Sequence, residues 1–143
     1  MRTSVKQLFL LLAAGCIILV NACGDKQPAQ SKLVGIWQGT DYSHDLKDVP
    51  AMYEQGGKEM NKNTRYIFKD DSTFTEIRFT YESTGKWYYN ANDKKLTLEF
   101  TKMQGPQEIN KPVYEVVTLT DKELKLKNSL NGQGFEYLTF TKK

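Results

Sequence analysis

Cysteine and histidine are almost missing from this 143-residue chain, which has Cys16, Cys23 and a single histidine, His44. Because Cys16 lies in the N-terminal leader described below, the rest of the chain keeps one cysteine and forms no internal disulfide. Zinc sites need several Cys or His ligands, and only Cys23 and His44 lie outside the leader. A lone loop histidine, with no serine on a nucleophile elbow, also argues against hydrolytic catalysis. The sequence therefore predicts a protein that is not an enzyme and has no cofactor.

A calcium loop is excluded as well. Asp41, Ser43 and Asp45 have the spacing of the first three ligands of such a loop. However, Leu46 stands where the sharp turn needs glycine, and Met52 stands where a bidentate carboxylate is required. We therefore predict no metal site, and we expect these aspartates to cap turns.

The chain also lacks a hydrophobic run long enough for a membrane-spanning helix. Its longest run is the 13 residues Leu8–Val20, whereas a span needs about 20. Arg2 and Lys6 precede the run, so residues 1–22 have the organisation of a secretory signal peptide. The residues after Cys23 are polar, so the sequence predicts a polar tether over 23–31.

The end of this leader resembles a bacterial lipobox. A branched residue, Val20, is followed by Asn21-Ala22-Cys23, with a small residue directly before the cysteine. The resemblance implies cleavage before Cys23, a diacylglycerol on its thiol, and acylation of the new amino terminus. It implies an outer-membrane lipoprotein, on the periplasmic face or at the cell surface. The alternative is an ordinary secretory signal with a chance cysteine.

A strong excess of one charge is missing too. The formal charge of +3 includes Arg2 and Lys6. Loss of the leader leaves 20 − 2 = 18 basic against 17 acidic residues, a net charge of about +1. Nucleic-acid binding needs a concentrated basic surface, so we expect no nucleic-acid partner.

The chain after the tether is instead rich in short segments where apolar and polar residues alternate, as in half-buried strands. In the third of these, we expect Thr75, Ile77, Phe79 and Tyr81 to face inward, opposite to Glu76 and Arg78. The eight candidate strands are Leu33–Trp37, Thr64–Lys69, Thr73–Tyr81, Gly85–Asn90, Leu96–Phe100, Val113–Leu119, Leu124–Lys127 and Phe135–Phe140.

Most connections between these segments are short, which requires antiparallel neighbours. Eight such strands with one apolar face predict an all-β, up-and-down barrel over residues 32–143, because closure buries that face and removes exposed edges. The exception is the long connection 41–63. Asp48 as N-cap, Pro50 in the first turn, and the spacing of apolar residues predict a short helix there, interrupted at Gly56-Gly57. The apolar residues are Val49, Met52, Tyr53 and Met60.

Four motifs in this order resemble those of the lipocalins, and more narrowly the small lipocalin-like lipoproteins of Gram-negative bacteria. They are Leu33-Val34-Gly35-Ile36-Trp37, Phe68-Lys69-Asp70-Asp71-Ser72-Thr73-Phe74, Gly85-Lys86-Trp87 and the segment Leu119–Leu126. Gly35, Trp37 and Trp87 are the fold residues that the resemblance implies. Many lipocalins place an arginine of the last strand over the first-strand tryptophan, and here only Lys142 and Lys143 are cationic in that region.

The remaining functional signal is the supply of aromatic residues at expected inward positions. These are Trp37, Tyr66, Phe68, Phe79, Trp87, Tyr89 and Phe100. Core packing is one explanation, and a ligand cavity is the other. If there is a cavity, the candidate ligand-binding residues are Met52, Tyr53, Met60, Phe68, Phe79 and Tyr89, with the 41–63 connection as a lid.

Two functions stay open at this point. The first is a lipid-anchored, non-catalytic module that binds a small apolar ligand. The alternative is a cell-envelope interaction module with a solid barrel, which docks a protein partner through its surface or the 41–63 loop. An internal apolar cavity of about 300 Å³ or more favours the first function.

Overall fold

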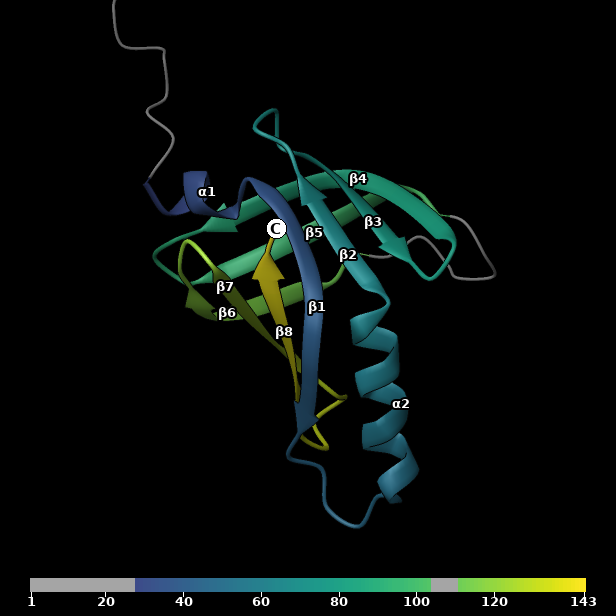
Figure 1. The fold of residues 1–143 in the computed structure, drawn as a ribbon. Coiled ribbons are helices and arrows are strands. Elements are labelled where there is room, and N and C mark those ends of the chain that lie inside the picture. The colour runs from purple at the N-terminus through teal and green to yellow at the C-terminus, as the bar shows by residue number, and fades with distance from the viewer. Residues whose placement is uncertain (1–27, 104–110) are drawn as a thin grey trace, which may run out of the picture.

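Eight strands pair in chain order and close on themselves in the computed structural model, which describes residues 28–103 and 111–143. Each strand is antiparallel to its neighbours, and β1 pairs with β8 from Trp37–Lys142 to His44–Glu136. The up-and-down barrel is therefore confirmed (Figure 1). Its strands are β1 (Gly35–His44), β2 (Thr64–Phe68), β3 (Thr73–Arg78), β4 (Tyr81–Asn90), β5 (Lys95–Lys102), β6 (Val113–Leu119), β7 (Glu123–Ser129) and β8 (Phe135–Lys142), and its helices are α1 (Pro28–Leu33) and α2 (Ala51–Lys62).

The alternation of apolar and polar residues explains which face of most strands points into the barrel. In β5, Leu96, Leu98 and Phe100 are buried at a spacing of two, and in β7 Leu124 and Leu126 are fully buried. Side chains at this spacing share one face of a strand. The inward faces of the strands therefore form one continuous apolar core.

The predicted third strand is wrong in extent and in orientation. β3 ends at Arg78, and β4 begins at Tyr81, which pairs with Arg78 across a tight turn. Phe79 lies in that turn with φ 54° and is 51% exposed. Within β3, Phe74 and Glu76 are buried, so the inward face is the opposite of the one expected. A shift of one residue reverses every side chain of a strand.

The helix predicted between the first two strands is confirmed, with three differences in detail. The connection begins after His44 rather than at Asp41, because β1 continues to His44. Asp48 is not the N-cap: the N-cap is Pro50, and no side chain caps the helix. The helix also continues through Gly56-Gly57 without a break. A Cβ at Gly57 would overlap the ring of Tyr42, so this glycine allows α2 to lie directly against β1. Contact with β1 compensates for the low helix propensity of glycine.

The other end of α2 is fixed by Asn61, which is only 3% exposed. Its amide Nδ2 donates hydrogen bonds to the backbone oxygens of Asp41 and Thr139. Asp41 and Thr139 are the residue pair that directly follows the shift in the β1–β8 register between Gly39 and Asp41. Asn61 thus satisfies carbonyl groups at a bulge and pins α2 to the seam where the barrel closes.

The opposite end of the barrel is closed by α1. Residues 28–31, which we assigned to the tether, form the first part of this helix, and Leu33 at its end is fully buried. The indole Nε1 of Trp37 donates to the backbone oxygen of Leu33 at 2.7 Å. Residues 1–27, with the predicted leader and Cys23, lie outside the described residues. Neither α1 nor α2 has the length and apolar character of a membrane span.

Candidate functional site

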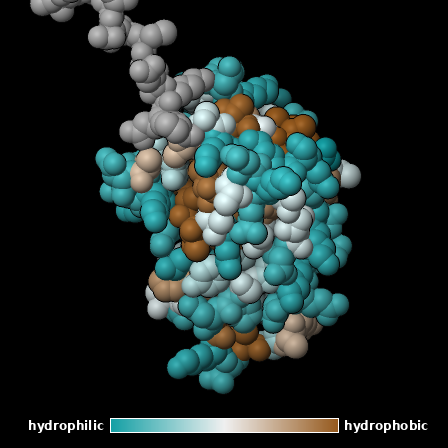
Figure 2. Space-filling view, turned by 60° about the vertical axis from the view of Figure 1, so that its left-hand side comes forward, coloured by the Kyte–Doolittle hydropathy of each residue, from teal (hydrophilic) through white to brown (hydrophobic). Residues whose placement is uncertain are grey.

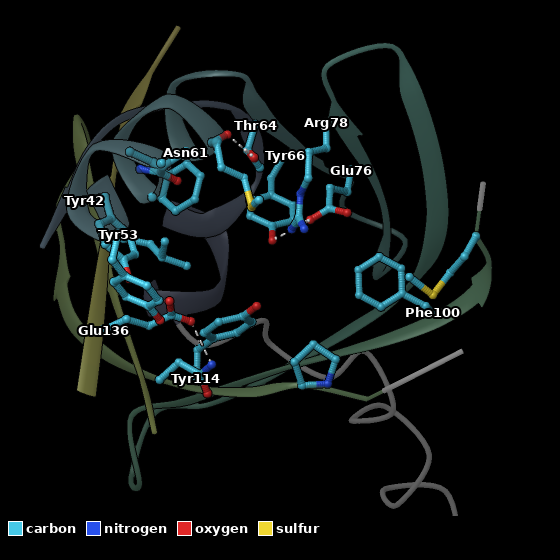
Figure 3. Close-up of a pocket in the computed structure, with 18 of the residues that line it drawn as sticks. Tyr42, Tyr53, Asn61, Thr64, Tyr66, Glu76, Arg78, Phe100, Tyr114 and Glu136 are labelled. Carbon is cyan, nitrogen blue, oxygen red and sulfur yellow. Dashed lines mark hydrogen bonds and ion pairs between the residues drawn. The ribbon is translucent and has the colours of Figure 1, made fainter. Parts of the chain in front are cut away.

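A cavity of about 900 Å³ occupies the half of the barrel next to α2. Its lining comes from α2 and from every strand except β4 (Figure 3). The lining residues are Tyr42, Met52, Tyr53, Gly56, Gly57, Met60, Asn61, Thr64, Tyr66, Glu76, Arg78, Phe100, Met103, Pro112, Tyr114, Asn128, Glu136, Leu138 and Phe140. The interior is therefore hollow on this side, and a space of this size accommodates a small molecule.

An aromatic layer separates the cavity from the other half of the barrel, next to α1. Core side chains fill that half, and we call it the closed half. Tyr66, Phe100 and Phe140 line the cavity and are also members of the buried core. The Tyr66 ring lies 5.6 Å from that of Phe68, and the Phe100 ring lies 5.0 Å from that of Phe74. Because Phe68 and Phe74 do not line the cavity, this layer is its floor.

A buried ion pair lies in the cavity wall. Arg78 Nη2 donates to Glu76 Oε1 at 2.7 Å, and the Tyr66 hydroxyl donates to the same oxygen at 2.9 Å. The Glu76 side chain is only 5% exposed. Arg78 Nε is buried and has no hydrogen-bond partner among the described residues. The pair therefore adds a polar region with a spare donor to an otherwise largely apolar space.

The two tyrosines beside this pair stay neutral over a wide pH range. Burial raises the pKa of Tyr114 to about 12, with the Glu76 carboxylate acting in the same direction. Burial also raises the pKa of Tyr66 well above its ordinary value. Burial alone would lower the pKa of Arg78, but the Glu76 carboxylate and the two tyrosines raise it overall. At neutral pH the cluster thus consists of one ion pair and two neutral hydroxyl groups.

A second polar group lies across the cavity, around Glu136 (Figure 3). Asn128 Nδ2 donates to Glu136 Oε1 at 3.0 Å. Tyr42 is 4% exposed, and its pKa is raised by burial first, then by its hydrogen bond with Tyr53 and by the Glu136 carboxylate. Glu136 is therefore surrounded by neutral donors, unlike Glu76.

The helix α2 supplies the rim of the cavity. Met52, Tyr53 and Met60 line the cavity and are 75%, 41% and 48% exposed. His44 packs against Tyr53 with an edge-on geometry and a ring distance of 5.3 Å, and it does not line the cavity. The cavity is thus reached from the end of the barrel that carries α2.

The structure brings together only half of the six predicted ligand-binding residues. Met52, Tyr53 and Met60 line the cavity. Phe68 is 1% exposed and packs against Trp87 in the closed half. Phe79 is in the exposed β3–β4 turn, and Tyr89 lies near α1, where its backbone oxygen accepts a hydrogen bond from Gln30.

Sequence reasoning missed the polar residues of the cavity, Glu76, Arg78 and Glu136, because charged side chains in alternating strands are usually solvated. A partial signal is Phe74, an apolar residue two positions before Glu76. Residues at this spacing share one face of a strand, and the structure shows that both are buried. Asp45, one of the aspartates expected to cap a turn, accepts a hydrogen bond from the backbone N–H of Phe135 at 2.6 Å. Within residues 28–103 and 111–143, no group of three or more His, Cys, Asp or Glu residues could hold a metal ion.

A model of the lipocalin-like domain matches residues 33–126, more than half of the chain. The chain belongs to the lipocalin-like family. No curated protein matches it. Among solved structures, a DUF4847 family protein from Bacteroides vulgatus is similar, with 18% sequence identity and a TM-score of 0.52 over 75% of this chain and 91% of that one. This likeness supports the fold alone.

This lipocalin-like barrel uses lysine where many lipocalins use arginine. Lys142 Nζ lies 5.1 Å from the centre of the Trp37 ring and donates to the backbone oxygen of Lys32 at 2.8 Å. Trp87 Nε1 donates to the backbone oxygen of Lys69 at 3.0 Å. Gly35 lies beneath Lys142, where a Cβ would overlap its side chain. The three fold residues inferred from the resemblance therefore all lie in the closed half.

Proposed function

We propose that this lipocalin-like protein is a non-catalytic module that binds a small ligand in the cavity beside α2. The observation that carries the proposal is the volume of about 900 Å³, three times the size at which we favour a binder over a solid barrel. The alternative of a protein-interaction module with a solid interior does not fit this cavity. On the face in Figure 2, hydrophobic residues also form separate groups among hydrophilic ones rather than one large patch.

The ligand has a largely apolar body. Met60, Phe100, Leu138 and Phe140 supply apolar wall, and methionine adapts to apolar shapes at low cost. Arg78 Nε, buried without a partner among the described residues, supports a ligand with a hydrogen-bond acceptor near the Glu76–Arg78 pair. Leaving a buried donor unpaired costs about 1–3 kcal/mol, which a ligand oxygen would recover.

Binding is tested on residues 24–143, which contain all eight strands and both helices. A neutral, polarity-sensitive dye such as Nile red is titrated while its fluorescence is recorded. The variant Leu138→Trp adds bulk to the cavity wall and should weaken the fluorescence increase. Val117→Trp places the same bulk on an exposed position of β6 and should leave it unchanged. Equal dye binding by both variants would refute the cavity as the binding site.

We also propose that the mature protein is lipid-anchored through Cys23 on the outer membrane. In support, α1 begins at Pro28, and the five residues from Cys23 reach at most about 18 Å. The anchor would therefore hold the closed end of the barrel near the membrane, with the α2 rim facing away from it (Figure 1).

The anchor is tested by fractionating cells that produce the unmodified chain or Cys23→Ala. The substitution should move the protein from the outer-membrane fraction to the soluble fraction. Cys16→Ala is the matched control and should leave the distribution unchanged. A Cys23→Ala protein that still fractionates with the outer membrane would refute the proposal.

A further inference from the structure

The cavity lining has more acidic than basic side chains. Three of its lining side chains are acidic or basic, namely the carboxylates of Glu76 and Glu136 and the guanidinium of Arg78. Glu76 and Arg78 form an ion pair at 2.7 Å and cancel each other. The lining of the cavity as a whole therefore carries one net negative charge.

That charge resides on Glu136. Its described partners are the amide of Asn128 at 3.0 Å and the neutral hydroxyl of Tyr42. No ion pair between Glu136 and a basic side chain is found within residues 28–103 and 111–143. His44 is opposite Glu136 in the β1–β8 register, and the described residues show no ion pair between them either. A carboxylate in a partly buried site is stabilised by a cation.

The surroundings of Glu136 also suit a cation. Tyr42 and Tyr53 lie on the same side of the cavity as Glu136 (Figure 3), and aromatic rings attract ammonium groups through their electron-rich faces. An anion in the same place would face a like charge at short range, where repulsion is strong because little water screens it. The Arg78 guanidinium does not offset this, because Glu76 already neutralises it.

We propose that the cavity selects a cationic amphiphile, an amine with an apolar body, whose ammonium group pairs with Glu136 between Tyr42 and Tyr53. This inference rests on the proposed function and names the chemical class of its ligand. It predicts that fatty acids, which share the apolar body but carry a carboxylate, are poor ligands. The apolar body would extend over the floor formed by Tyr66, Phe100 and Phe140.

The test compares three ten-carbon probes with different head groups on residues 24–143. Decylammonium, 1-decanol and decanoate are titrated by isothermal calorimetry at pH 8, where histidine is ordinarily neutral. We expect the Kd of decylammonium to be at least about tenfold lower than that of decanoate, with 1-decanol between them. Decanoate binding as tightly as decylammonium would overturn the proposal.

Glu136→Gln then isolates the carboxylate. The variant should lose about tenfold in affinity for decylammonium and keep its affinity for 1-decanol. The matched control is Glu115→Gln, which removes an exposed glutamate paired with Lys127 on the outer face of β6, and it should change neither affinity. Unchanged decylammonium binding by Glu136→Gln would overturn the proposal.

The outcomes separate this inference from the proposed function. Tight binding of 1-decanol without a preference for decylammonium over decanoate would contradict only the amine selectivity. No binding of any probe would contradict the binding function and the inference together. The ranking of the three probes on the unmodified sequence stands even if Glu136→Gln fails to show a cooperative thermal transition.

Discussion

The two halves of this barrel are built from the same strands but differ in how their interiors are filled. In the closed half, below α1, Trp37, Phe68, Leu98 and Leu124 are at most 1% exposed and fill the interior. In the open half, beside α2, the same inward faces surround about 900 Å³ and include an ion pair. Burial of apolar area is the main source of folding stability, so the closed half holds the barrel together and the open half is available for binding.

The ion pair sharpens this contrast. Buried ion pairs are often no more stabilising than apolar side chains of similar volume, because both charges lose their hydration. Glu76 and Arg78 are therefore poorly explained as stabilising residues. Their position in the cavity wall agrees with the contact with a ligand that we propose.

The largest effect on stability is expected from breaking that pair. Glu76→Ala removes the acceptor of Arg78 and of the Tyr66 hydroxyl, and should lower the free energy of unfolding by about 3–5 kcal/mol. Urea denaturation followed by tryptophan fluorescence measures the change.

The double variant Glu76→Leu, Arg78→Leu is the control for this prediction. Because it removes both charges, it should recover most of the lost stability while it weakens ligand binding. A double variant as unstable as Glu76→Ala would mean that the pair is a structural requirement of the fold, and the contrast between the two halves would fail.

A smaller effect separates the two halves directly. Leu98→Ala in the closed half leaves a new void in a filled core and should cost about 3 kcal/mol. Leu138→Ala enlarges a cavity that already exists, so it should cost less than about 1.5 kcal/mol. Urea denaturation of both variants is the measurement. Equal losses would show that the open half is as tightly packed as the closed half.

The smallest effect at any ordinary pH comes from Tyr114, because burial raises its pKa in the folded protein to about 12, above the ordinary tyrosine value of about 10. Its neutral form is favoured by folding, so its contribution is complete below pH 10 and is lost as pH rises from 10 to 12. The loss should be about 1.4 kcal/mol per pH unit in that interval. Denaturation at pH 9, 10 and 11 should show a decline that is shallower in Tyr114→Phe, and identical slopes would contradict the burial of this hydroxyl.

The sequence predicts the wall of the barrel better than its contents. Strict alternation in Leu96–Phe100 predicts the buried face of β5 correctly, because all of its apolar side chains lie on one face of the strand. In Thr73–Tyr81, both faces contain apolar and polar residues, so alternation alone does not choose the inward one. Phe74 determines the choice through its contact with Phe100, and this contact between distant segments is not visible in local sequence.

The helix and the cavity illustrate the same limit. Gly56-Gly57 suggests a break in α2, yet Gly57 is the point of contact with Tyr42. Whether the barrel is hollow depends on the total volume of the inward side chains from all eight strands. This total cannot be derived from any single segment of the sequence. Glu136 is unremarkable in sequence and becomes notable only because it lies in the cavity wall and forms no ion pair with a basic side chain of the described residues.

The central claim is that the open half of the barrel is a ligand cavity, and native mass spectrometry tests it most directly. The domain is purified from its producing cells, and its intact mass is compared with that of Leu138→Trp produced in the same way. We predict an added mass of one small molecule on the unmodified domain, with lower occupancy in Leu138→Trp than in Val117→Trp. A domain with no added mass, or equal occupancy in Leu138→Trp and Val117→Trp, would contradict the claim.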